Sequence, residues 1–129
     1  MGFFDIFKSK NDKAKLNHLK NLLCVAMADG KLEQSELAAI SSVISREGMN
    51  PNELERIVKN PNTIDFVVPE KDSDKIRFLK DLVMLMMVDG NIDDNEMEVC
   101  KLAALSYGYR PEVVGALILD IIKEITQNN

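Results

Sequence analysis

The residues best suited to chemistry in this chain are acids that occur twice at the same spacing. Asp29 and Glu36 bound the octapeptide DGKLEQSE, and Asp89 and Glu96 bound the octapeptide DGNIDDNE. Carboxylate oxygens are the ligands that hard divalent cations such as Ca²⁺ and Mg²⁺ prefer. The two octapeptides lie 60 residues apart, so the chemistry that one supports is repeated in the other.

The same octapeptides are also typical of a turn between two helices. The glycine of each copy suits the left-handed backbone that follows a helix end. Three residues later Glu33 or Asp93 stands where a helix cap is expected, and Glu36 or Glu96 follows at the spacing of a capping box. Helix capping therefore explains the glutamates without any ligand.

The aspartate that opens each octapeptide is not explained by capping. Asp29 and Asp89 each follow a predicted helix, and an anion is electrostatically unfavourable at a helix C-terminus. One interpretation is that the aspartate side chain initiates a turn. The other is that it ligates a cation.

An ordinary EF-hand is excluded, although the spacing matches part of its calcium loop. The first and third ligand positions of that loop would fall on Val25 and Met27, or on Leu85 and Met87, where oxygen ligands are required. A weaker cation site made from two half-loops stays open. Its candidate metal ligands are Asp29, Glu36, Asp89 and Glu96, and its candidate cations are Ca²⁺ and Mg²⁺.

The acidic octapeptides belong to a longer duplication that predicts the architecture. Residues 19–58 align with residues 79–118 without a gap, which indicates one supersecondary unit used twice. We expect a single all-α domain over residues 1–129, a compact bundle of about six to seven helices built from two pseudo-symmetric repeats. Repeat 1 covers about 13–59, an extended linker covers 60–72, and repeat 2 covers about 73–127. Helical periodicity places the helices at about 13–28, 34–47, up to 59, 73–88, 94–107 and 111–126.

The charge distribution narrows the classes of partner. The net charge is −5, and it is concentrated in residues 65–129, which carry −6 while residues 1–64 carry +1. A nucleic-acid-binding domain is expected to present a basic face, so nucleic acid is not an expected partner. Residues 89–98 hold five acids and no base, a patch that attracts divalent cations or basic protein partners.

Nothing in the sequence indicates an enzyme. Cys24 and Cys100 lie in apolar helical runs without a partner at metal-ligand spacing, so we expect both to be buried. The only histidine, His18, lies among polar residues and is expected to be solvated. Nucleophile–histidine pairs, zinc-type motifs and glycine-rich phosphate loops are all missing from the sequence.

The N-terminal segment supports an alternative function. Phe3, Phe4 and Phe7 precede a stretch rich in lysine, which suits contact with an anionic membrane surface. The chain would then be a peripheral membrane-associated adaptor; the simpler interpretation is an apolar turn that docks on the body. No apolar run approaches the roughly 20 residues that cross a bilayer, and no signal peptide is visible. We therefore expect a cytoplasmic protein.

Two A/V-D-G corners in an all-helical chain of this length resemble the TerB-like family, which includes tellurite-resistance TerB proteins and the N-terminal domain of DjlA-type co-chaperones. The resemblance covers about residues 15–127 and is carried by Ala28-Asp29-Gly30 with Glu36 and Val88-Asp89-Gly90 with Glu96, supported by Gly48 and Gly108. It implies a bundle of about seven helices, an acidic surface for divalent metal, and a stress-response role with protein partners. Two residues depart from the family pattern: Glu33 replaces a hydroxyl cap, and Val88 replaces a small residue.

Overall fold

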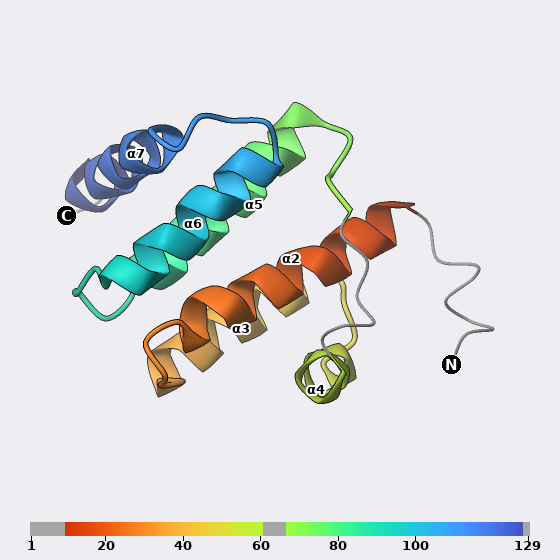
Figure 1. Ribbon diagram of the computed structural model, residues 1–129. Coiled ribbons are helices and arrows are strands. Elements are labelled where there is room, and N and C mark those ends of the chain that lie inside the picture. Colours follow the sequence, from red (N-terminus) through yellow and green to blue (C-terminus); the bar gives the residue numbers. More distant parts are fainter. Residues whose placement is uncertain (1–9, 61–66, 128–129) are drawn as a thin grey trace.

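The computed structural model describes residues 10–60 and 67–127, and these residues form helices without a strand (Figure 1). The elements confirm an all-α bundle and lie close to the ranges expected from periodicity. They are α2 (Lys10–Met27), α3 (Gln34–Arg46), α4 (Asn52–Lys59), α5 (Asp72–Met87), α6 (Asp94–Ser106) and α7 (Val113–Gln127). None of these helices is long and apolar enough to cross a membrane.

Helices α2 and α5 form the centre of the bundle. Both bury residues on most of their circumference, and they contact each other along their length. Figure 1 shows α6 beside α2, with α3 and α5 behind these two and α7 at one end of the molecule. The core is largely aliphatic, as the composition predicts, with Phe78 its largest fully buried side chain.

The two D-G corners have the same backbone geometry. Gly30 and Gly90 both adopt φ +85°, and each donates its N–H to the carbonyl oxygen three residues earlier, at 2.9 and 3.1 Å. The side chains of the preceding aspartates accept hydrogen bonds from the N–H of Lys31 and Asn91, at 2.9 and 3.1 Å. The interpretation that aspartate initiates this turn is therefore confirmed.

Equivalent residues of the two repeats meet in two places. His18 stacks on Phe78, with ring centroids 4.0 Å apart, and the charge of Glu36 acts on Glu96. The two residues of each pair are 60 positions apart in the sequence. When a twofold axis relates two repeats, equivalent residues can contact each other only near that axis. The superposition of the two halves stays a prediction, and these two contacts are consistent with it.

Several sequence expectations are wrong in detail. Cys24 is exposed, whereas Cys100 is buried as expected. His18 is buried rather than solvated, because α5 and α3 cover the side of α2 on which it lies. Part of the predicted linker, residues 61–66, lies outside the described residues.

We predict that the corner glycines are required by backbone conformation alone. A methyl group at Gly90 would meet no atom within 4 Å, so Gly90→Ala costs only the strain of alanine at φ +85°, about 1–2 kcal/mol. Gly115 within α7 is the matched control, because its backbone is helical and equally open. Gly115→Ala should raise the free energy of unfolding by about 0.5–1 kcal/mol. Urea denaturation checks both, and equal effects of the two substitutions would contradict the argument.

Candidate functional site

The two acidic corners come together at one end of the bundle. The α2–α3 corner and the α5–α6 corner lie at the same end of the molecule in Figure 1. Glu36 is in the first turn of α3 and Glu96 is in the first turn of α6, and each is only 2% exposed. Glu36 and Glu96 are therefore shielded from solvent. Asp29 and Asp89, by contrast, are exposed.

The two glutamates differ in their capping roles. The backbone N–H of Glu33 donates to Oε1 of Glu36 at 2.9 Å, as the capping box predicts. In the second copy Asp93 caps the helix with its own side chain, which accepts from the N–H groups of Asn95 and Glu96 at 2.7 and 3.3 Å. The side chain of Glu96 has no equivalent cap bond among the described residues.

Burial and like charge raise the pKa values of both glutamates. Desolvation is the largest cause for Glu96, followed by repulsion from Glu36 and Asp29 and by a hydrogen bond to Glu36, and together they raise its pKa to about 7. Desolvation also raises the pKa of Glu36, although its bond from the Glu33 backbone opposes the shift. The pKa of Glu96 therefore lies near neutral pH, well above that of an ordinary glutamate.

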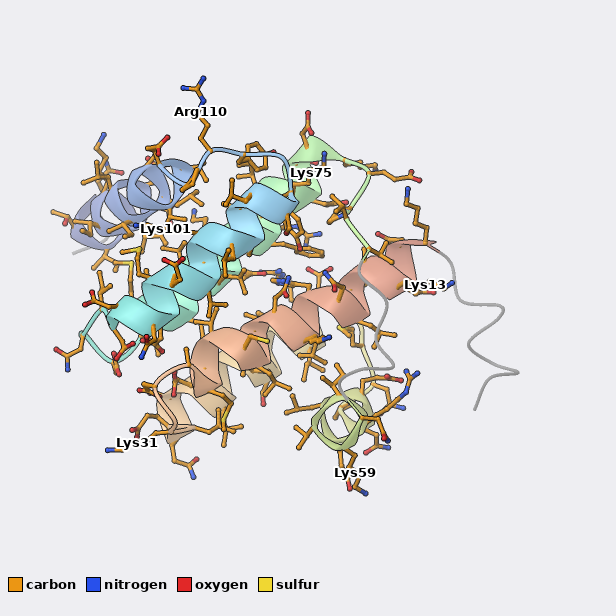
Figure 2. All side chains as sticks on the ribbon, in the orientation of Figure 1. Lys13, Lys31, Lys59, Lys75, Lys101 and Arg110 are labelled. Atoms are coloured by element: carbon orange, nitrogen blue, oxygen red, sulfur yellow. The ribbon has the colours of Figure 1, made fainter. Side chains whose placement is uncertain are left out.

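No basic side chain neutralises this cluster within residues 10–60 and 67–127. None of the ion pairs formed there involves Asp29, Glu36, Asp89 or Glu96. Figure 2 shows the labelled Lys31 at the α2–α3 corner with its side chain directed away from the bundle. These four acids are therefore not neutralised by an ion pair among the described residues.

The arrangement does not form a ready-made metal site. The described part of the chain contains no group of three or more His, Cys, Asp or Glu side chains placed to hold a metal ion. Asp29 and Asp89 direct an oxygen to the turn backbone in this conformation. Cation binding by the four predicted ligands would require these aspartates to rotate toward the glutamate pair, so the assignment stays a prediction.

A second polar cluster, not anticipated from the sequence, joins three helices. Asp81 on α5 accepts two hydrogen bonds from the guanidinium of Arg46 on α3, at 2.8 and 2.6 Å. Its Oδ2 also lies 2.9 Å from Nε2 of His18 on α2. Arg46 and Arg77 both bind Glu47, which extends the cluster to the end of α3. The signal in the sequence was an aspartate within the apolar stripe of α5.

Burial explains the protonation states of this second cluster. Desolvation lowers the pKa of His18, although its contact with Asp81 opposes that shift. Burial acts to raise the pKa of Asp81, but hydrogen bonds from Arg46 and His18 outweigh it, and the pKa lies below its usual value. Asp81 is therefore an anion held by donors. Because His18 is 1% exposed, its imidazole cannot reach a substrate from solvent in this conformation, and the cluster joins helices instead.

An apolar groove lies between α3 and α5 beside the acidic corners. It has a volume of about 300 Å³ and is open to solvent on one side. Its walls include Ala39 and Val43 on α3 and Met84 and Leu85 on α5, and Val88, directly before Asp89, lines it as well.

The described residues present no surface that suits a membrane or a nucleic acid. The side chains of Phe3, Phe4 and Phe7, on which membrane contact depends, lie outside them. The basic residues labelled in Figure 2 point to different sides of the molecule rather than forming one face. A basic face is what nucleic-acid binding would require.

Comparison with known proteins finds no matching family model, no matching curated protein and no matching solved structure. The resemblance to the TerB-like family therefore rests on the two D-G corners and their spacing. Any functional assignment has to be argued from the acidic site itself.

Proposed function

We propose that this chain is a non-enzymatic, TerB-like stress-response interaction module that takes a divalent cation at its paired acidic corners. The observation that carries the proposal is the convergence of two sequence-distant corners. Asp29, Glu36 and Asp89 all act electrostatically on Glu96, although they come from different parts of the chain. A fold that needed these acids only as helix caps would not have to bring the two caps together.

The electrostatics favour a small, hard cation. Four carboxyl groups converge without a neutralising base among the described residues, and two of them are desolvated. A divalent cation would remove the repulsion that raises the pKa of Glu96. The donors are all carboxyl oxygens, which suits Ca²⁺ or Mg²⁺ rather than a metal that prefers sulfur or imidazole.

The expected affinity is weak. The exposed aspartates must give up their hydrogen bonds to the turn backbone, and Glu96 must release its proton. We expect a dissociation constant for Ca²⁺ of about 10⁻⁴–10⁻³ M, the weak end of the range known for protein sites. The stress-response role follows from the family resemblance. A protein partner with an apolar side chain beside a basic one would complement the groove and corner together.

We predict that Ca²⁺ or Mg²⁺ added to chelator-treated protein shifts the backbone amide NMR signals of both corners together. Lys31 and Asn91 are the reporters, because their N–H groups donate to the aspartates that would have to move. The shifts should saturate at about millimolar metal.

The matched variants are Asp29→Asn with Asp89→Asn, and Asp120→Asn as the control. Asparagine keeps a side-chain oxygen for the turn hydrogen bond, so the double variant loses charge without losing the corner. Asp120 is an exposed acid on α7, a helix that belongs to neither corner. The double variant should lose the metal-induced shifts and Asp120→Asn should retain them. Absence of shifts at millimolar metal, or their survival in the double variant, would refute the cation proposal.

A further inference from the structure

We propose that the exposed apolar stripe of α7, formed by Leu119, Ile122 and Ile125, is a self-association surface on which a second copy of this chain packs antiparallel. The stripe lies on a helix that belongs to neither acidic corner, so the inference is independent of cation binding. It follows from the apolar surface that the bundle leaves uncovered and from the two charges that border it.

Helix α7 carries more apolar surface than the bundle covers. Only three of its 15 residues are charged. The helix packs mainly on α5 and α6, and Figure 1 shows it at one end of the molecule. The side chains that it buries there are Val114, Leu117 and Ile121. The three residues of the stripe stay between 46% and 62% exposed.

The exposed residues form one continuous surface rather than scattered positions. Leu119 and Ile122 are three residues apart, and so are Ile122 and Ile125. Residues at this spacing are neighbours on a helix. Single exposed apolar side chains are ordinary on a monomer, whereas a contiguous patch marks a surface that another molecule covers.

The stripe is bordered by one acid and one base on the same edge of the helix. Glu112 precedes Leu119 by seven residues, and Lys123 follows it by four, so both lie beside Leu119 at about whole helical turns. The N–H of Ala116 donates to the carbonyl oxygen of Glu112 at 3.3 Å, which keeps Glu112 in the helical register.

These two charges cannot neutralise each other within one chain. Glu112 and Lys123 are about 16 Å apart along the helix axis, well beyond the reach of an ion pair. Both are exposed, and neither takes part in an ion pair within residues 10–60 and 67–127. The opposite edge of α7 is already engaged, because Glu124 pairs with Lys80 of α5.

A twofold axis that crosses α7 between the two charges makes this pattern self-complementary. In the resulting antiparallel pair, the same edges of the two helices lie side by side. Glu112 of each copy then faces Lys123 of the other, and the two stripes cover each other. A parallel pair would place the charged edges on opposite sides of the contact and would join no charges.

A second copy suits the stripe better than other occupants. Helices that lie on membranes are rich in Lys and Arg on their polar side, whereas α7 has one lysine and two acids. An unrelated protein would need an acid and a base at the same spacing as Glu112 and Lys123. A second copy has that spacing by symmetry.

The expected association is weak. A helix of 15 residues is about 22 Å long, so one pair of helices buries less than the roughly 1,200 Å² at the lower limit of standard interfaces. We expect a dissociation constant of about 10⁻⁵–10⁻⁴ M. At about 1 μM the chain is then a monomer, and unfolding measured there reports the stability of the monomer.

The first test is sedimentation velocity of the full chain in chelator, from about 10⁻⁶ to 10⁻³ M protein. The mean mass should rise from 14.5 kDa toward twice that value. Leu119→Glu should raise the dissociation constant by at least about 100-fold, because symmetry removes two leucines from the contact. Leu119 is exposed, so this variant keeps its fold. Asp120→Asn, outside the stripe on the same helix, should associate as wild type does.

Charge reversal tests the antiparallel arrangement. Glu112→Lys and Lys123→Glu should each raise the dissociation constant by about 5- to 30-fold, because two attractive pairs become repulsive. In an equimolar mixture of these variants the two introduced charges face each other, and so do the two native ones. The mixture should therefore associate as wild type does. Salt at about 0.15 M screens the remote charges.

A mass of 14.5 kDa throughout the concentration range would overturn the proposal and leave the stripe to a different protein. Wild-type association of Leu119→Glu would overturn it as well. A mixture that associates no better than either single charge variant would refute the antiparallel pair. Amide NMR signals of α7 in the wild type should shift with protein concentration, a readout that needs no variant. Because chelator is present throughout, failure of the cation proposal leaves these outcomes unaffected.

Discussion

Asp81→Asn is expected to lower the free energy of unfolding by about 3 kcal/mol at pH 7, close to the range for breaking a buried ion pair. Asp81 accepts hydrogen bonds from Arg46 and His18 at 2.6–2.9 Å and ties α5 to α3 and α2. Asparagine turns an amide donor toward one of these donors and removes one of the two carboxylates that Arg46 binds. The side chain of Arg46 is 42% exposed, so water solvates part of its charge in the variant. The loss of stability should therefore stay below the largest values known for breaking a buried ion pair.

Urea denaturation at pH 7 measures this effect, with Asp120→Asn as the matched control. Asp120 is exposed, so its replacement should change stability by less than about 0.5 kcal/mol. The pKa of Asp81 is lowered, so its contribution is present above the usual value of 3.8 and is lost as the pH falls through the lower folded-state pKa. The difference between Asp81→Asn and wild type should therefore shrink in strong acid. Equal stability of Asp81→Asn and Asp120→Asn at pH 7 would show that the cluster does not join the helices.

Phe78→Ala is expected to cost about 3–5 kcal/mol, because it removes the largest buried side chain from the contact between the two repeats. The ring of Phe78 stacks on His18 with an interplanar angle of 6°, and the guanidinium of Arg77 lies 5.1 Å from its centroid. Alanine would leave a cavity beside the imidazole and remove its stacking partner.

Leu119→Ala provides the comparison for Phe78→Ala. Leu119 lies on the exposed side of α7, so its truncation should change stability by less than about 0.5 kcal/mol. Thermal or urea unfolding of the two variants checks the contrast. A loss below about 1 kcal/mol for Phe78→Ala would mean that the stacked pair is not a principal contact between the repeats.

The helices could be predicted because their signals are local. Gly30 and Gly90 end helices through their left-handed backbone, and the spacing of apolar residues predicts where the helices run. The same reasoning placed Glu36 in the first turn of α3, where it does bind the Glu33 backbone. Such features depend on neighbours within a few residues, so the sequence contains them directly.

Burial of individual polar side chains could not be predicted in this way. His18 lies among polar neighbours in the sequence, yet it is buried because Phe78 and Asp81 approach it from α5. Cys24 lies in an apolar run, yet it is exposed because the other helices pack against a different side of α2. In both cases the outcome depends on which side of α2 the second repeat covers.

By itself the sequence determined an all-helical chain with a duplicated D-G corner, a capped helix after each corner and an excess of acid in the second half. Only the tertiary structure decided that Glu36 and Glu96 are both buried and that the charge of Glu36 acts on Glu96. The physical reason is that capping and helix periodicity act over a few residues. The pairing of two carboxyl groups 60 residues apart depends instead on how α2 and α5 pack, a contact that local sequence does not specify.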